Sequence, residues 1–306
     1  MSRDIAAQCP AEENLCPQNV VMIKGTIVLE GGARRGIFTS GVLDYLMEQN
    51  VYFSDVIGVS FGACNASSYV SEQHGRMRDC TAQKENNYGM YAKLGKFMKD
   101  GSILDMDLLF DKYPNEYFPF DYKTYFQSES ECEMVVTNLN TGEAEYLTER
   151  KDKERLMKIC RASSSMPLLS PIVKIDGKPY LDGGIADSVP IERALEKGNE
   201  KIVLVLTRNP GYRKKMTSKS MATVYRHKYK NFPEFVTTLI RRNLEYNKQM
   251  AMVNKLEAEG KIFVLRPTEP PVGRLEKDYD KLMNFYKHGY HMMQERYEDL
   301  KEYLKV

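Results

Sequence analysis

The stretch Asp55-Val-Ile-Gly-Val-Ser-Phe-Gly62 decides the fold of this chain. An apolar, β-branched run leads directly into a serine flanked by glycines, and the pattern after it predicts a helix over residues 61–72. Flanking glycines let neighbouring backbone segments approach a strained strand-to-helix turn without a Cβ clash. A chance G-x-S-x-G would lack this strand and helix context. The stretch therefore predicts a nucleophile elbow that presents Ser60.

A glycine-rich loop precedes the elbow in the segment Glu30-Gly-Gly-Ala-Arg-Arg-Gly36. It joins a buried strand at 26–29 to a helix at 36–49, so its N–H groups lie at a helix N-terminus, where they can stabilise an oxyanion. A phosphate-binding P-loop would end in Gly-Lys-Ser/Thr, and a dinucleotide loop would need glycine in place of Ala33. The loop therefore predicts an oxyanion site, to which Arg35 adds positive charge or orientation.

Short connections between alternating strands and helices characterise residues 26–72. This order is typical of a parallel, doubly wound α/β sheet, and right-handed crossovers place both loops at the carboxyl edge of adjacent strands. Residues 75–127 are rich in Tyr, Phe and Met and predict short helices over that edge. Further along, the pattern predicts hairpins at 133–148 and 172–180, helices at 153–160 and 190–197, and a sheet strand at 201–206.

Beyond Thr207 the pattern changes to amphipathic helices. Apolar spacing predicts a helix through 236–256, a lone strand at 261–266 and one final helix over 286–304. We place a boundary near Asn209-Pro-Gly211. The expected organisation is a flexible lead-in (1–24), an α/β domain (25–207) and a mostly helical C-terminal region (208–306).

A candidate base lies in Leu181-Asp-Gly-Gly184, which follows a hairpin strand. In isolation this segment would be an ordinary aspartate turn. A serine nucleophile needs a base, however, and the four histidines fall outside the clear sheet core. A Ser60–Asp182 dyad is therefore favoured over a triad, although His227 stands in triad order.

These segments together resemble the patatin-like phospholipases over roughly residues 25–207. That family combines a glycine-rich oxyanion loop, a G-x-S-x-G serine and a D-G-G/A aspartate, and the stretch Gly58–Asn65 is similar to its serine region. The sequence departs at Ala33, where a third consecutive glycine is usual. The segment after Thr207 resembles the helical extension of a bacterial subgroup.

The resemblance implies a serine lipid acyl hydrolase that cleaves carboxylic esters of phospholipids or lysophospholipids. It implies Ser60 as nucleophile, Asp182 as general base, and an oxyanion site formed by Gly31, Gly32, Arg35 and Gly36. Two alternatives stay open: a general carboxylesterase or acyltransferase, and a non-catalytic lipid-binding regulatory protein.

Neither a cofactor nor a metal is expected. Six cysteines, at 9, 16, 64, 80, 132 and 160, form no CxxC pair and do not cluster with histidine, which favours reduced thiols in a cytoplasmic protein. The polar start, Met1–Gln18, lacks the apolar core of a secretory signal, and no apolar run approaches the ~18 residues of a membrane span.

A basic segment, Lys201–Pro233, carries nine Lys and Arg residues and no Asp or Glu. Such a run is equally well a solvated basic face or a surface that docks peripherally on anionic lipid headgroups, where each basic residue contributes about 1 kcal/mol. Nucleic acid is not an expected partner, because nothing else in the sequence supports it.

Overall fold

The computed structural model describes residues 21–84 and 104–306. These residues form one eight-stranded sheet in the order β5-β6-β3-β2-β1-β7-β8, with β4 paired to β3. The strands are β1 (Val21–Leu29), β2 (Val51–Val59), β3 (Glu131–Asn138), β4 (Ala144–Leu147), β5 (Val173–Ile175), β6 (Lys178–Asp182), β7 (Ile202–Val205) and β8 (Phe263–Leu265).

The predicted doubly wound, mainly parallel sheet is confirmed. Strands β3, β2, β1, β7 and β8 are mutually parallel, whereas β4, β6 and β5 join through antiparallel pairs that form the two predicted hairpins. The lone strand predicted at 261–266 is wrong, because β8 pairs with β7 through Val203–Phe263 to Val205–Leu265. Strand β1 begins at Val21; residues 1–20 of the predicted lead-in, with Cys9 and Cys16, lie outside the described residues.

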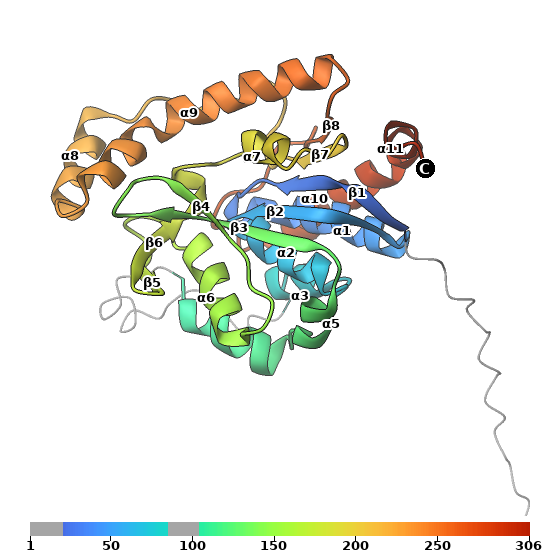
Figure 1. Ribbon diagram of the computed structural model, residues 1–306, viewed down its shortest axis with the longest axis horizontal. Helices are drawn as coiled ribbons and strands as arrows, with labels where there is room; N and C mark the ends of the chain where they lie inside the picture. Colours follow the sequence, from blue (N-terminus) through green and yellow to red (C-terminus); the bar gives the residue numbers. More distant parts are fainter. Residues whose placement is uncertain (1–20, 85–103) are drawn as a thin grey trace, which may run out of the picture.

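Helices cover both faces of the sheet (Figure 1). Helices α7 and α9 lie on one face, and α1, α2 and α6 lie on the other. The helices are α1 (Ile37–Glu48), α2 (Phe61–Val70), α3 (Arg76–Thr81), α5 (Tyr122–Gln127), α6 (Lys153–Ser163), α7 (Ile191–Glu196), α8 (Lys219–Lys228), α9 (Pro233–Ala258), α10 (Tyr279–Glu295) and α11 (Tyr297–Leu304). To these are added a π-helix, η3 (Leu108–Tyr117), and two short 3-10 turns, η1 (Ala33–Gly36) and η4 (Gly183–Ile185).

Alternation along the central strands fills a core on each face of the sheet. In β1, Ile27 and Leu29 pack with α1 and α2, while Val28 between them packs toward α7 and α9. All three side chains are fully buried. Continuous apolar runs in the sequence thus become strands covered on both faces, as parallel sheets require.

Helix α10 packs directly on α1, backbone against backbone. A Cβ added at Gly41 would come 2.2 Å from the carbonyl oxygen of Tyr286, and one at Gly289 would come 2.0 Å from that of Phe38. Only glycine leaves room for this approach. The C-terminal region therefore packs, through α10, against the helix that follows the glycine-rich loop.

The single final helix predicted over 286–304 is wrong, because it breaks at Arg296 into α10 and α11. The Arg296 guanidinium lies 4.7 Å from the centre of the Phe263 ring, and its Nε donates to Asp299 Oδ2 at 2.7 Å. The helical spacing of apolar residues continues across Arg296, so the sequence pattern alone gave no sign of a break there.

Candidate active site

Ser60 lies at the turn between β2 and α2, with φ 57° and ψ −122°. A Cβ at Gly58 would lie 2.5 Å from the carbonyl oxygen of Gly62, and one at Gly62 would lie 2.3 Å from that of Leu29. Gly58 therefore lets the turn close on the start of α2, and Gly62 lets it close against β1. A non-glycine residue in this conformation costs about 1–3 kcal/mol, strain that is typical of functional sites.

A serine in α6 fixes this strained turn. The Ser60 amide donates to Ser163 Oγ at 2.8 Å, and the Ser163 hydroxyl donates to the carbonyl oxygen of Val135 at 2.7 Å. The end of α6 thus ties the turn after β2 to strand β3. Sequence reasoning missed Ser163, because a serine within the run 162–167 carries no signal of a partner about 100 residues away.

The structure brings Ser60 and Asp182 together from positions 122 residues apart. The Ser60 hydroxyl donates to Asp182 Oδ2 at 2.7 Å, and the Gly184 amide donates to Asp182 Oδ1 at 2.8 Å. Asp182 ends β6, and its carbonyl oxygen accepts from the Thr137 hydroxyl at 2.8 Å. A Cβ at Gly183 would lie 2.1 Å from the Val135 carbonyl oxygen, which explains the glycine after the aspartate.

Burial raises the pKa of Asp182, as expected for a carboxylate that has lost its water. The nearby Arg242 and the hydrogen bond from Ser60 act in the opposite direction and do not offset the burial. Arg242 Nε donates to the Gly184 carbonyl oxygen at 2.5 Å, so this cation is held beside the aspartate by α9. A raised pKa makes the carboxylate a stronger base toward an alcohol.

The glycine-rich loop lies against the elbow. A Cβ at Gly31 would lie 2.9 Å from the Cβ of Ser60, and Gly31, Gly32 and Arg35 line a cavity together with Ser60. Gly36 lies outside that cavity and packs on Phe61, whose Cδ1 atom would be 2.2 Å from an added Cβ.

Ala33 adopts φ 50°, the conformation that the usual third glycine would favour. For an alanine this left-handed backbone costs roughly 1–2 kcal/mol, so the substitution of glycine destabilises the turn only modestly. The Arg35 amide donates to the Gly32 carbonyl oxygen at 3.3 Å, while the amides of Gly31, Gly32 and Ala33 donate no backbone hydrogen bond within the described residues. These three amides are therefore available to an anion.

None of the four histidines lines a cavity that contains Ser60. His74 contacts Glu48 at 2.8 Å, and His288 accepts from the Thr268 amide at 3.1 Å. Within the described part of the chain, no cluster of His, Cys, Asp and Glu could hold a metal ion, and the four cysteines there are free.

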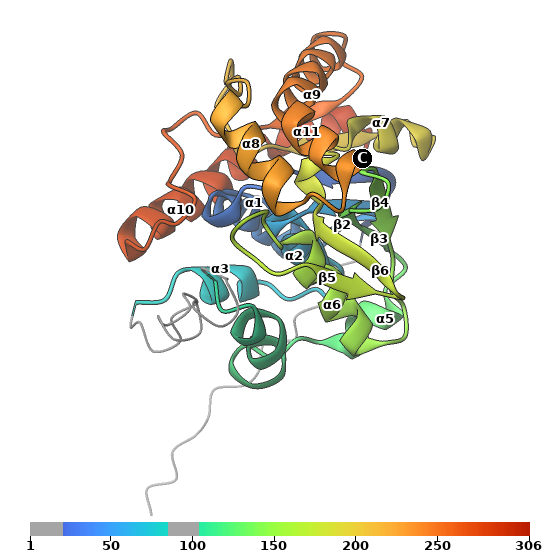
Figure 2. The ribbon, with the colours of Figure 1, turned by 90° about the vertical axis from the view of Figure 1, so that its left-hand side faces the viewer.

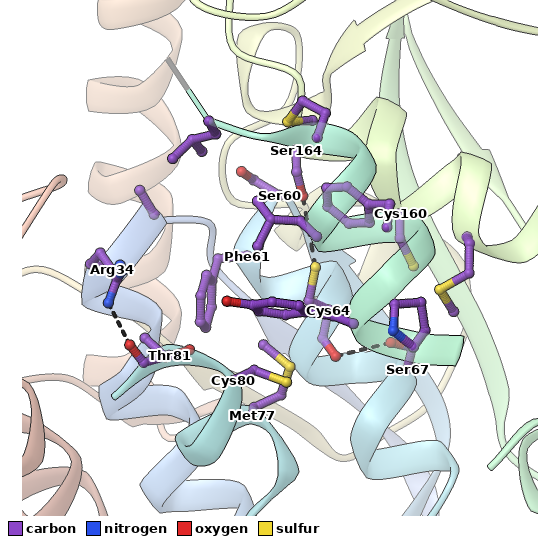
Figure 3. Close-up of a pocket in the computed structure, with 18 of the residues that line it drawn as sticks. Arg34, Ser60, Phe61, Cys64, Ser67, Met77, Cys80, Thr81, Cys160 and Ser164 are labelled. Atoms are coloured by element: carbon purple, nitrogen blue, oxygen red, sulfur yellow. Dashed lines mark hydrogen bonds between the residues drawn. The ribbon is translucent and has the colours of Figure 1, made fainter. Parts of the chain in front are cut away.

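An apolar cavity opens on one side of Ser60 (Figure 3). Figure 3 shows Ser60 beside Phe61, Cys64 and Ser164, with Met77 and Cys80 on the far side of Phe61. Helices α3 and η3 cover this cavity, so the described part of the 75–127 region lies over the active edge as predicted; residues 85–103 lie outside the described residues. The walls are mainly apolar and suit a hydrocarbon chain.

A second cavity, which we call the cationic cavity, opens on the other side of Ser60. Figure 2 views the molecule from the carboxyl ends of the parallel strands, with α8 and the start of α9 above these strand ends and α3 below. Ser60, Asp182 and the glycine-rich loop line it, and its cationic members are Arg35, Arg208, Lys214, Arg242 and Arg274. The sequence analysis counted Arg208 and Lys214 within the basic segment but did not place them beside Ser60.

Helix α9 holds the basic segment against this cavity. The Lys214 amide donates to Asn247 Oδ1, and Asn247 Nδ2 donates back to the Lys214 carbonyl oxygen, both at 2.9 Å. One turn earlier, Asn243 Nδ2 donates to the Lys215 carbonyl oxygen at 2.7 Å. The position of Lys214 is therefore fixed by the fold.

Together, the fold and the site define a class of α/β proteins in which a serine on an elbow faces an aspartate across the ends of a mainly parallel sheet. Residues 27–195 match the family described as patatin-like phospholipase. Because this match covers more than half of the 306 residues, the chain belongs to the patatin-like phospholipase family. A domain of unknown function (DUF6363) matches residues 232–305.

Curated relatives extend the comparison. The uncharacterized protein YjjU of Escherichia coli (strain K12) is 30% identical over 186 residues, which are 59% of this chain and 51% of YjjU. Lysophospholipase NTE1 of Candida albicans is 25% identical over 291 residues, and lysophospholipase nte1 of Aspergillus terreus is 26% identical over 295 residues. Each of the latter two matches covers 90% of this chain; the chain spans about half the length of YjjU and about a fifth of each lysophospholipase.

Proposed function

We propose that this protein is a serine lipid acyl hydrolase that cleaves carboxylic esters of phospholipids or lysophospholipids. The observation that carries the proposal is the hydrogen bond of 2.7 Å from the Ser60 hydroxyl to a desolvated carboxylate, Asp182, at the mouth of an apolar cavity. Family membership and the similarity to two lysophospholipases support it.

In the proposed mechanism, Asp182 takes the Ser60 proton as the serine oxygen attacks the ester carbonyl. The free amides of Gly31, Gly32 and Ala33 stabilise the oxyanion, and each such donor is typically worth ~3 kcal/mol in the transition state. The alcohol leaves with the proton from Asp182, and Asp182 then activates water to hydrolyse the acyl-enzyme. The acyl chain occupies the apolar cavity throughout.

A lipid hydrolysis screen tests this function. The native protein and the Ser60→Ala variant are incubated with the same lipid extract, and released fatty acids and lysolipids are compared by mass spectrometry. We expect fatty acid release from glycerolipid esters by the native protein only. Transfer of the acyl group to an added alcohol in preference to water would favour the acyltransferase alternative. Lack of labelling by a fluorophosphonate probe would favour a lipid-binding protein.

Replacing all four histidines, at 74, 227, 288 and 291, by glutamine is expected to leave ester hydrolysis within about threefold of the native rate, because none lines a cavity with Ser60. Initial rates on a short p-nitrophenyl ester check this expectation, with thermal unfolding to verify the fold. A large loss that restoring His227 alone reverses would mean that the site is a triad.

Contact with anionic membranes is the second part of the proposal. Within the described residues no helix is both long and apolar enough for a membrane span. Helix α8 and the segment before it instead expose Met216, Met221 and Val224 among basic residues, and Met221 also lines the cationic cavity. Apolar side chains that enter the headgroup region beside basic ones are typical of peripheral binding.

Co-sedimentation with vesicles tests this contact. We expect binding to vesicles that contain anionic lipid, weakened at least several-fold by high salt and by the double variant Met221→Ser/Val224→Ser, because both charge and apolar insertion contribute. The control Leu195→Ser removes an exposed apolar side chain on α7 and should not affect binding. Binding that ignores both salt and anionic lipid content would exclude electrostatic docking.

A further inference from the structure

The cationic cavity carries an excess of positive charge that the dyad chemistry does not use. Its two carboxylates are already engaged: Asp182 accepts from Ser60 and Gly184, and Glu30 Oε2 accepts from the amide and the hydroxyl of Thr207 at 2.6 and 3.0 Å. Within the described residues, none of the five cations lining this cavity forms an ion pair with a carboxylate.

Lys214 is the clearest example. Its Nζ atom lies 3.6 Å from the centre of the Tyr246 ring and 3.4 Å from Ser188 Oγ, so an aromatic face and a neutral hydroxyl are its partners. Burial, followed by repulsion from Arg242, lowers the pKa of Lys214 well below its ordinary value. An ammonium that is half-buried and has no counter-ion is costly, and an incoming anion would relieve that cost.

Arg35 is the second example. Its side chain is 6% exposed, and its Nε atom is buried without a hydrogen-bond partner. Burial, with smaller contributions from repulsion by Arg208 and Arg274, lowers the pKa of Arg35 to about 10. A buried guanidinium that lines a cavity and lacks part of its hydrogen bonding is suited to a multidentate oxyanion, because phosphate accepts several N–H donors at once.

The position of this charge relative to Ser60 indicates what the anion belongs to. Ala33, Ser60, Met166 and Arg274 line both cavities, so an ester at Ser60 directs its acyl chain into the apolar cavity and its alcohol part into the cationic cavity. In a glycerophospholipid the phosphate stands only a few bonds from the ester oxygen. Arg274 borders both cavities, and the other four cations line only the cationic one, so most of the charge lies on the side of Ser60 where that phosphate would be.

We propose that Arg35, Lys214 and Arg274 bind the phosphate of a glycerolipid whose ester lies at Ser60, and that they select phosphomonoester headgroups over choline-bearing and neutral ones. The selectivity follows from charge: a phosphomonoester carries close to two negative charges at neutral pH, whereas the trimethylammonium group of choline would be repelled by the same cations. This inference rests on the proposed hydrolase function.

Most of this subsite lies outside the part of the chain that matches the family. Arg208, Lys214, Arg242 and Arg274 all follow residue 195, where the patatin-like match ends. The proposal therefore gives the C-terminal region a role in substrate choice, since it supplies Lys214 and Arg274, two of the three cations proposed to bind the phosphate.

Substrate preference tests the proposal. Hydrolysis of lysophosphatidate, lysophosphatidylcholine and monoacylglycerol with the same acyl chain is measured in neutral detergent micelles. We expect kcat/KM for lysophosphatidate to exceed that for monoacylglycerol by about tenfold or more, as charge-assisted hydrogen bonds allow. Lys214→Met should lower this ratio about tenfold. The matched control Lys215→Met removes an exposed neighbour outside the cavity and should leave the ratio unchanged.

A binding measurement separates this inference from the hydrolase proposal. Lysophosphatidate and inorganic phosphate are titrated calorimetrically into the Ser60→Ala variant, with and without Lys214→Met. We expect lysophosphatidate to bind and Lys214→Met to weaken it about tenfold, with inorganic phosphate binding far more weakly.

Three other results would separate the subsite from the hydrolase function or overturn one of them. Equal hydrolysis of lysophosphatidate and monoacylglycerol by the native protein would overturn the subsite while leaving the hydrolase intact. Inorganic phosphate that binds as tightly as lysophosphatidate would overturn the assignment to a lipid. If the native protein cleaves no ester but binds lysophosphatidate in a way that depends on Lys214, the subsite would be supported and the hydrolase proposal would be overturned.

Discussion

Replacing Ser60 with alanine is expected to lower kcat/KM for short p-nitrophenyl esters by about 10⁴-fold or more, to the rate that binding and oxyanion stabilisation leave without a nucleophile. The variant should fold normally. Alanine keeps the Cβ that the turn already accommodates at φ 57°, and the hydrogen bond from the residue 60 amide to Ser163 does not involve the lost hydroxyl.

Two measurements make this result specific. Mass spectrometry after mixing with a fluorophosphonate should show one adduct on the native protein and none on Ser60→Ala. The matched control Ser71→Ala removes a buried hydroxyl from the opposite end of the same helix, where it donates to the Ser68 carbonyl oxygen at 3.1 Å, and should retain activity. Full ester hydrolysis by Ser60→Ala would exclude Ser60 as the nucleophile.

The second large effect is expected from Asp182→Asn, which should lower kcat/KM by about 10³–10⁴-fold because the base is lost while the shape of the side chain is kept. Asp187→Asn is the matched control. Asp187 is also a buried carboxylate with a raised pKa, but it accepts from Tyr146 at 2.7 Å and Gln249 at 2.6 Å and lines neither cavity with Ser60. Equal losses in the two variants would mean that buried charge in general, not a base at Asp182, supports activity.

The raised pKa of Asp182 has consequences for pH. Activity requires the ionised form, so kcat/KM of the native protein should rise with pH on the acid side, with a midpoint above the ordinary aspartate value. The contribution of Asp182 to the free energy of unfolding changes with pH in the opposite direction and decreases as pH rises. A folded-state pKa above the unfolded value means that the contribution of Asp182 is fully present below the unfolded value and is lost as pH rises through the folded one.

Ionised Asp182 therefore costs stability at neutral pH. Asp182→Asn should raise Tm there by about 1–3 °C, and the difference from the native protein should shrink toward acid pH. Scanning calorimetry over this range checks the sign. A lower Tm for the variant at neutral pH would show that the carboxylate is well compensated in the fold.

The sequence was most informative where a local pattern determines local structure. The strand–serine–helix stretch around Ser60 and the Asp176–Gly177 turn both fold as predicted, because strand runs, glycines and turn residues act over a few positions. Asp182 was found because serine chemistry needs a base, and the fold brings its carboxylate to the Ser60 hydroxyl.

Features that depend on distant contacts were missed. Strand β8 has three residues and was taken as isolated, because pairing with β7 depends on how α9 returns the chain to the sheet edge. Ser163 carries no pattern that reveals its bond to the Ser60 amide. The cations of the second cavity come from separate segments between residues 35 and 274, and only folding gathers them beside Ser60.

The contact between α1 and α10 has a consequence for how this protein can be divided. Glycines at 41 and 289 let the two helix backbones touch, so a chain cut after the matched family segment would leave a bare apolar stripe on α1. Helix α1 follows directly on the glycine-rich loop, whose amides are the proposed oxyanion donors. The matched family segment therefore depends on the C-terminal third to cover α1, and the two parts are expected to fold as one unit.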